Sequence, residues 1–253
     1  MNKYFYLILW FLISCNNENN KSSATNNKKT NDANGQQICW TGTLNNKIPV
    51  LISYQIDDNI ITGTIIYLNT KQQLPIKLIG TIEEDKSYRL LEFEETGNVT
   101  GVITGLPTDK TFNGSWFSPK TRKELTLNLV KKDTTINYTK IETEPENIFG
   151  LYRYQFSEEG YQGDFRINKI AAGHASFGIT CVTGEPSRNI ALINEDTIAL
   201  NNTQFIYKLE GTDDCEFEVK FFKGFAYIRY TKGFCKGQFG MNASIDGIFL
   251  KMK

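Results

Sequence analysis

Residues 48–56 read IPVLISYQI, a run in which large apolar side chains recur at every second position. Successive side chains of an extended strand point to opposite faces, so Val50, Ile52, Tyr54 and Ile56 fall on one face. A helix would instead need apolar residues at intervals of three and four. This stretch therefore predicts a β-strand, and it sets the pattern by which the rest of the chain is interpreted.

Similar short runs surround this strand. Turn residues such as Asp57-Asp58-Asn59, Gly97-Asn98 and Pro119-Lys120 separate them at intervals of about 8 to 14 residues, which is typical of an antiparallel sandwich or barrel. No helical period of useful length interrupts them. With residues 39–43 leading, the runs give about eight strands, at residues 60–68, 76–82, 88–93, 99–104, 112–117 and 125–130 besides the opening one.

Glycine recurs inside these strands, at Gly63, Gly80, Gly101 and Gly114. Glycine weakens a flat strand but suits bulges and tight bends, so we expect a meander that curls toward a barrel. The alternative is a local Gly-Thr preference without any role in curvature. The segments GTIIY, IKLIGTI and FNGSWFSP resemble uncharacterised exported bacterial proteins, and that resemblance implies no activity.

The second half of the chain is again rich in strands. Alternation places Phe177, Ile179 and Cys181 on one face of HASFGITCV, and Phe217, Val219 and Phe221 on one face of CEFEVKFF. Aromatic residues are frequent, so we expect a packed barrel interior more than a roomy ligand cavity. The expected strands are GLYRYQF, DFRINKI, HASFGITCV, NIALI, DTIAL, QFIYKL, CEFEVKFF, FAYIRYT and SIDGIFLKM.

The end of the chain, residues 215–249, resembles the closing segment of exported bacterial proteins of unknown function. In those proteins a cysteine opens an aromatic strand and a second cysteine precedes a turn like the GFCKGQFG of this chain. The insertion of Lys236-Gly237-Gln238 departs from that pattern. The resemblance implies a lipocalin-like or related small barrel and supplies no catalytic residue.

The N-terminus has the layout of an export signal. Lys3 precedes an apolar run at residues 4–13, which is about half the length that a membrane-spanning helix needs. The tetrad Leu12-Ile13-Ser14-Cys15 resembles the lipobox of bacterial lipoproteins, which implies lipidation of Cys15 after cleavage. The alternative is an ordinary cleaved signal with a chance cysteine. We therefore expect a lipoprotein anchored in the bacterial cell envelope, in the outer membrane, with its periplasmic or surface face undecided.

Composition divides the chain into five segments. Residues 1–14 form the signal peptide, and residues 15–37, rich in asparagine, carry the lipidated Cys15 and a flexible tether. Residues 38–131 form a first β domain, residues 132–147 a charged linker, and residues 148–253 a second β domain. Within the linker, Asp133-Thr134-Thr135 resembles a bacterial O-glycosylation acceptor, as Asp196-Thr197-Ile198 also does, although a solvated linker remains the default.

Charge and cysteine content narrow the partners. Lysine plus arginine and aspartate plus glutamate both number 28, and such a balance disfavours a nucleic-acid partner. Besides Cys15, the chain has Cys39, Cys181, Cys215 and Cys235, which permit three complete pairings. We favour a Cys215–Cys235 disulfide at the ends of adjacent strands, and we expect Cys181 to be a core thiol. A metal site is not expected, because no CxxC pair occurs.

Catalytic candidates are few. His174 is the only histidine, so a nucleophilic triad would have to combine it with a group such as Ser176 and Asp164. A strand-end polar residue is the simpler interpretation of His174. Paired carboxylates could serve a glycosidase, although solvated turns explain them equally well; they are Glu83-Glu84, Glu94-Glu95, Glu158-Glu159 and Asp213-Asp214. We expect no catalytic residue and no cofactor.

Two surfaces are candidates for binding. The segment VTGEPSRNI, residues 182–190, predicts a turn that presents Arg188 and Asn189, and an arginine suits carboxylates or phosphates. A plain connecting turn is the alternative. A second patch interleaves aromatic residues with lysines that include Lys232 and Lys236, although a half-buried strand pair would look the same.

These observations predict a non-catalytic binding or scaffolding module for a protein or glycan partner. A lipocalin-like carrier of a small apolar ligand would require an emptier barrel, and an inhibitor of an exported hydrolase is a further alternative.

Overall fold

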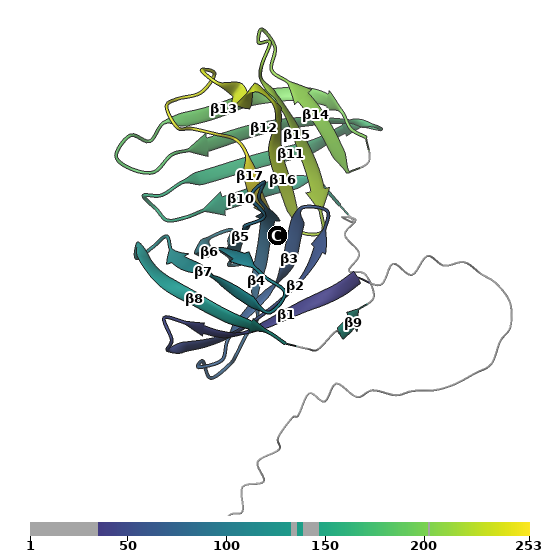
Figure 1. Cartoon of the computed structure of the whole chain (residues 1–253). Coiled ribbons are helices and arrows are strands. Elements are labelled where there is room, and N and C mark those ends of the chain that lie inside the picture. The colour runs from purple at the N-terminus through teal and green to yellow at the C-terminus, as the bar shows by residue number, and fades with distance from the viewer. Residues whose placement is uncertain (1–34, 133–135, 139–146, 202) are drawn as a thin grey trace, which may run out of the picture.

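The computed structural model describes residues 35–132, 136–138, 147–201 and 203–253 (Figure 1). The described residues form β-strands joined by turns, and their one helical element is the short 3₁₀ turn η1 (Gly233–Cys235). The all-β prediction is confirmed. The strands belong to two antiparallel, barrel-like sheets.

The first sheet is a closed barrel. Its strands follow one another in the order β2 to β8, and β1 closes the ring because it pairs with both β8 and β2. The eight strands match those expected from the alternation of the sequence. They are β1 (Gly35–Leu44), β2 (Ile48–Asp57), β3 (Ile60–Tyr67), β4 (Ile76–Ile82), β5 (Tyr88–Phe93), β6 (Val99–Pro107), β7 (Thr111–Ser118) and β8 (Lys123–Lys131).

Large side chains fill the interior of this barrel. The alternation read in β2 places Val50, Ile52 and Tyr54 inside, each buried to 1% exposure or less. Ile56, expected on the same face, is 37% exposed because it lies at the end of the strand. Trp40 on β1 donates a hydrogen bond from Nε1 to the Tyr54 hydroxyl at 2.9 Å, and the Trp40 ring packs edge-on against Phe112 with centroids 5.8 Å apart. The interior is therefore a packed core that leaves its polar groups satisfied.

Glycines allow neighbouring strands of this barrel to approach one another closely. Gly63 on β3 lies opposite Tyr54, and a Cβ atom at Gly63 would collide with the Ser53 carbonyl oxygen of β2. Gly114 on β7 lies opposite Gly105 of β6, and its Cβ atom would meet the Thr104 carbonyl oxygen. Glycine at these positions lets neighbouring backbones approach closely where the sheet coils.

The second sheet follows the same path as the first but is split along one seam. Its spatial order is β13-β12-β11-β10-β17-β16-β15-β14. β10 and β17, the first and last strands of this sheet along the chain, therefore pair as β1 and β8 do in the barrel. The split lies between β13 and β14, the two ends of the spatial order. The strands are β10 (Gly150–Gln155), β11 (Gln162–Ala171), β12 (His174–Val182), β13 (Ile190–Ala199), β14 (Gln204–Lys208), β15 (Glu216–Phe222), β16 (Phe225–Lys232) and β17 (Gly247–Lys251).

Aromatic side chains pack across the seam and through this second core. Phe177 of β12 contacts both Phe205 and Tyr207 of β14, with ring centroids 4.9 and 5.0 Å apart. The Tyr207 hydroxyl donates to Asp196 Oδ2 of β13 at 2.7 Å. Farther inside, Phe165 stacks on Phe221 at 5.8 Å. The space that an open barrel would offer to a ligand is thus occupied by rings.

Three details differ from the sequence-based expectation. The segments NIALI and DTIAL belong to one strand, β13. The polar residues between them remain part of this strand, because its pairing with β12 shifts register opposite residues 177–179. The strand β1 begins at Gly35, inside the expected tether, because residues 35–37 pair with β9 (Ile136–Tyr138). That short strand lies within the expected linker, of which residues 133–135 and 139–146 fall outside the described residues.

The two sheets are packed against each other. One hydrophobic cluster joins outward-facing residues of the barrel, such as Leu91, Phe93 and Val99, to residues of the second sheet, such as Phe225 and Leu250. The Gln155 amide donates to the Gly97 carbonyl oxygen at 3.0 Å, and Lys253 forms an ion pair with Glu95 at 2.8 Å. These contacts place the turns of both sheets beside one another.

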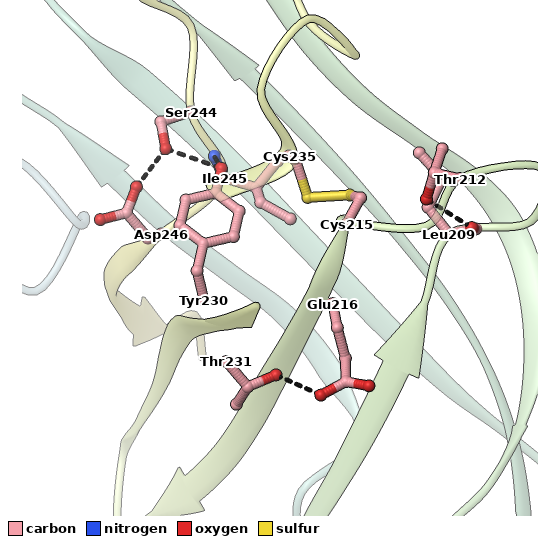
Figure 2. Close-up of a disulfide and its surroundings, with 10 residues drawn as sticks. All are labelled: Leu209, Thr212, Cys215, Glu216, Tyr230, Thr231, Cys235, Ser244, Ile245 and Asp246. Carbon is pink, nitrogen blue, oxygen red and sulfur yellow. Dashed lines mark hydrogen bonds between the residues drawn. A yellow bond between two sulfur atoms is a disulfide. The ribbon is translucent and has the colours of Figure 1, made fainter. Parts of the chain in front are cut away.

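A disulfide fastens the end of the second sheet (Figure 2). Cys215, immediately before β15, is bonded to Cys235 in η1, immediately after β16, across a sequence separation of 20. This is the pairing expected from the sequence. Cys181 instead is a buried thiol within the apolar core, at 2% exposure, also as expected.

Candidate functional site

A polar groove of about 770 Å³ lies where the two sheets meet. Three hairpin turns form its walls: the β5–β6 turn and the β7–β8 turn of the barrel, and the β10–β11 turn of the second sheet. The groove residues used below are Glu94, Asn98, Thr100, Lys120, Arg122, Gln155, Phe156, Glu158 and Glu159.

Hydrogen bonds hold each barrel turn in shape. In the β5–β6 turn the Glu94 amide donates to the Asn98 carbonyl oxygen at 2.9 Å, and Gly97 takes a positive φ of 83° that glycine adopts readily. In the β7–β8 turn the Arg122 amide donates to the Ser118 carbonyl oxygen at 2.8 Å. The groove is therefore walled by turns that are closed by their own backbone bonds.

The groove brings together side chains of both charges. Glu94 belongs to one of the acidic pairs noted in the sequence and Glu158 and Glu159 form another, and packing of the two sheets places these three glutamates at this groove. Lys120 and Arg122 face them from the β7–β8 turn. All five side chains are exposed and hydrated, so a ligand has to replace their water with hydrogen bonds of its own.

Neutral groups complete the groove. Asn98 and Gln155 provide amides, and Asn98 Nδ2 also donates to Glu94 Oε2 at 3.3 Å. The half-buried Phe156 ring is held edge-on by Tyr154, with centroids 5.8 Å apart. A rigid aromatic ring among amides and carboxylates can contact the apolar face of a ligand while the polar groups bind its hydroxyls.

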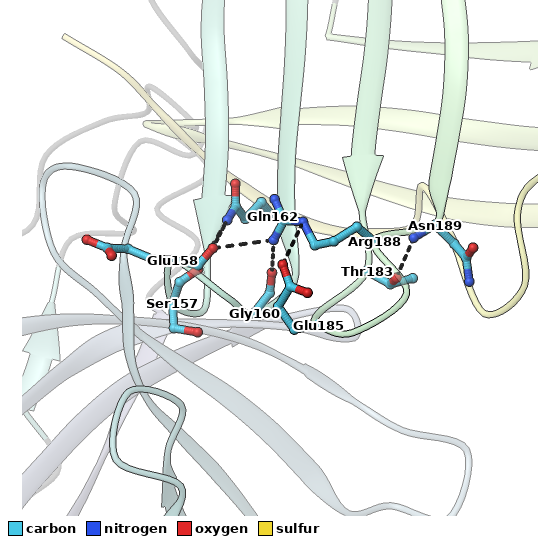
Figure 3. A network of polar contacts seen from close by, with 8 residues as sticks. All are labelled: Ser157, Glu158, Gly160, Gln162, Thr183, Glu185, Arg188 and Asn189. Atoms are coloured by element: carbon cyan, nitrogen blue, oxygen red, sulfur yellow. Dashed lines mark hydrogen bonds and ion pairs between the residues drawn. The ribbon is translucent and has the colours of Figure 1, made fainter.

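The expected recognition loop is hydrogen-bonded to the β10–β11 turn, which forms one wall of this groove (Figure 3). Arg188 Nη1 donates to the carbonyl oxygens of Glu158 and Gly160 at 3.3 and 3.4 Å, and its Nε lies 3.8 Å from Glu185 Oε1. The Glu185 amide donates to the Glu159 carbonyl oxygen at 2.7 Å. Arg188 therefore braces the β10–β11 turn, whose residues line the groove, and its role in binding a partner stays a prediction.

Asn189 is likewise engaged within the chain. Its amide donates to Thr183 Oγ1 at 2.8 Å (Figure 3), and its side-chain Nδ2 donates to the Met241 carbonyl oxygen at 2.8 Å. Asn189 thus ties the loop to the segment between η1 and β17. The structure gives it a positioning role, and partner binding by Asn189 remains untested.

The two lysines singled out in the sequence lie elsewhere, near the disulfide. Lys232 Nζ donates to the Asp213 carbonyl oxygen at 2.9 Å and lies 3.5 Å from Asp214 Oδ1. Lys236 is exposed in the loop after η1. Neither lines the groove, so Lys232 and Lys236 do not form one site with Arg188, and their role in binding also stays a prediction.

The considered catalytic triad is not assembled. His174 is exposed at the start of β12, with Nδ1 3.2 Å from the Ala172 carbonyl oxygen. Asp164 lies opposite Thr180, six residues along β12 from His174. Since a strand rises about 3.3 Å per residue, the two are roughly 20 Å apart along the sheet. Asp164 is instead held by Arg153 at 2.7 and 3.0 Å.

One buried glutamate, surrounded by hydrogen-bond donors inside the barrel, was not predicted from the sequence. Glu92 on β5 is 1% exposed, and its Oε1 accepts hydrogen bonds from the Tyr67 hydroxyl at 2.7 Å and from Trp116 Nε1 at 2.6 Å. The Thr100 hydroxyl lies 3.3 Å from Oε2. Burial raises the pKa of Glu92, and these three donors partly oppose that effect. The sequence signal was available: Glu92 shares a strand face with Leu90.

No cluster of three or more histidine, cysteine, aspartate or glutamate side chains that could hold a metal ion occurs within the described ranges. Among the helices of the same ranges, none is long and apolar enough to cross a membrane. A scan against protein-family models finds no match, and searches of curated proteins and of solved structures find no significant similarity. The site must therefore be interpreted from its own chemistry.

Proposed function

We propose that the chain is a non-catalytic binding module, held at the bacterial cell envelope by a lipid on Cys15, and that its polar groove binds a glycan or protein partner. The lipobox-like tetrad Leu12-Ile13-Ser14-Cys15 supports the lipid anchor and an outer-membrane location. The up-and-down course of both eight-stranded sheets supports a lipocalin-like assignment of the fold.

The observation that carries the proposal is a contrast between interior and surface. Rings and aliphatic side chains fill both cores, whereas the groove between the sheets is open and polar. A carrier of the usual barrel type needs an empty interior. Binding on the outside, at turns that rigid sheets hold in place, is the use that this architecture favours.

The chemistry of the groove favours a glycan. Sugar hydroxyls hydrogen-bond to carboxylates and amides, which Glu158, Glu159 and Gln155 provide, and an aromatic ring such as Phe156 packs on the apolar face of a sugar. An extended peptide with charges of both signs fits the same groups through Lys120 and the glutamates. The two partner classes therefore share one surface.

A glycan array tests the proposal. We expect the full chain to bind a defined set of oligosaccharides, and the double variant Glu158→Gln/Glu159→Gln to lose about tenfold or more in affinity, since charge-assisted hydrogen bonds are removed. The matched control is Glu83→Gln/Glu84→Gln, an acidic pair in the β4–β5 turn away from the groove. Equal binding by both double variants would contradict a role for the groove.

The anchor has its own test. Cells that express the chain are given an alkyne-labelled fatty acid, and we expect the label on the wild-type protein and none on Cys15→Ser. Label on both proteins, or on neither, would contradict lipidation at Cys15.

A further inference from the structure

A second, apolar cleft lies on another side of the contact between the sheets. It consists of two adjoining hollows of about 360 and 800 Å³ that share Gly63, Thr64 and Lys77 of the barrel. The outer face of β3 and β4 forms one wall, and the β15–β16 turn with the C-terminal residues forms the other. Hollows of this size are typical of small-molecule sites.

The lining of the cleft is mostly apolar. Phe222 and Phe225 flank the β15–β16 turn and stack in parallel, with ring centroids 4.7 Å apart and an interplanar angle of 4°. Ile79 lies opposite them, and Leu74 at the far rim is 64% exposed. Ile79, Phe222 and Phe225 are already only 1 to 4% exposed, so the gain from binding would come mainly from the apolar surface of the ligand chain itself, at about 25 cal/mol for each Å² removed from water.

A lysine stands where the two hollows join. A Cβ atom built on Gly224 would lie 3.3 Å from Lys77 Nζ, so the ammonium reaches across the cleft to the β15–β16 turn. Glu95, whose negative charge acts on Lys77, is paired with Lys253 at 2.8 Å. No hydrogen bond or salt bridge to Lys77 Nζ forms in the part of the chain that the structure describes. Burial lowers the pKa of Lys77, as expected for an ammonium that lacks a bound anion.

A second polar group in the cleft lacks a partner. Gln37 lines the smaller hollow, and its Oε1 is the one buried side-chain oxygen or nitrogen among the described residues without a hydrogen bond. Gln37 on β1 and Lys77 on β4 are separated by three strand spacings, each about 4.8 Å, so they lie roughly 15 Å apart. A buried acceptor without a donor is costly, and a ligand hydroxyl would satisfy it.

We propose that this cleft binds a long-chain carboxylic acid whose carboxylate pairs with Lys77, whose chain lies on Phe222 and Phe225, and whose distal hydroxyl donates to Gln37. A monoanion suits the cleft, because Lys77, Lys251 and Lys253 line the larger hollow together with Glu94 and Glu95, three positive charges against two negative ones. This site shares only Glu94 with the polar groove and does not rest on the function proposed for the groove.

Calorimetric titration of palmitate into the full chain carrying Cys15→Ser tests the head-group contact. We expect binding, a loss of about tenfold or more for Lys77→Met, and substantial rescue by Lys77→Arg, which retains the charge. Lys47→Met, an exposed lysine of the β1–β2 turn, is the matched control and should bind as the parent does. Absent binding, or equal affinity of Lys77→Met and Lys47→Met with unchanged melting temperatures, would overturn the proposal.

A second titration tests the distal contact. We expect 12-hydroxydodecanoate, whose extended chain matches the span of roughly 15 Å between Lys77 and Gln37, to bind severalfold more tightly than dodecanoate, and Gln37→Leu to abolish that advantage. If the hydroxyl gives no advantage, Gln37 does not select the ligand and this part of the proposal fails. Glu158→Gln/Glu159→Gln should leave palmitate binding unchanged, so failure in the cleft and failure in the groove can be told apart.

Discussion

The buried Glu92 cluster allows a quantitative prediction for Tyr67→Phe. This change removes one hydrogen bond of 2.7 Å and leaves the ring in place. Because the pKa of Glu92 is raised above its ordinary value, the carboxyl is protonated at about pH 4 and ionises only at higher pH. A hydrogen bond to a neutral group contributes about 0.5–1.5 kcal/mol and one to a charged group about 1.5–3 kcal/mol. We therefore expect Tyr67→Phe to destabilise the fold by roughly 1 kcal/mol at pH 4 and by roughly 2 kcal/mol at an alkaline pH at which Glu92 has ionised.

Urea denaturation at both pH values measures this difference, with a fall in the unfolding midpoint of about 1 M at the alkaline pH. In the wild type a raised folded-state pKa means that Glu92 contributes most stability below its ordinary pKa, near 4.5, and that this contribution is lost as pH rises. The control is Tyr161→Phe, a half-exposed tyrosine whose change should stay within about 0.5 kcal/mol. An equal loss at both pH values would refute the assignment of Tyr67 as a donor to a titrating carboxylate.

Other predictions concern the fold. Replacing Cys215 and Cys235 by serine should cost about 3 kcal/mol in chemical denaturation, the entropy of an opened loop, and reductant should mimic the change in the wild type. Gly63→Ala should destabilise the barrel by about 2 kcal/mol or more in thermal melts, whereas Gly178→Ala, where a Cβ atom meets only ordinary contacts, should change little. Burial raises the pKa of Cys181 to about 12, so iodoacetamide should label it only after unfolding; rapid labelling of native protein would contradict its burial.

Alternation in the sequence was sufficient to find the strands of the barrel. Val50, Ile52 and Tyr54 alternate with exposed or half-exposed neighbours, so both the strand and its inner face could be predicted. Closure of the barrel could not be predicted from alternation, because the pairing of β1 with β8 joins residues some ninety positions apart and depends on register. The split seam between β13 and β14 is likewise a property of the assembled sheet.

The candidate sites show where local patterns fail. Glu92 lies beside acidic residues that form a turn, and its donors Tyr67 and Trp116 are 25 and 24 residues away along the chain. The acidic pairs of the groove were visible as pairs, but only the packing of two sheets brings them together. Arg188 could be predicted as a loop arginine, whereas its contacts with the carbonyl oxygens of Glu158 and Gly160 and with the Glu185 carboxylate depend on the assembled fold.

The central claim, that the groove between the sheets is the binding surface, can be tested most directly by photo-crosslinking in living cells. A benzophenone amino acid replaces Lys120 at the groove or Lys47 on the distant β1–β2 turn. We expect a discrete adduct from position 120 and none from position 47, because benzophenone reacts with nearby C–H bonds of proteins and sugars alike. No adduct at position 120, or the same adducts from both positions, would contradict the claim.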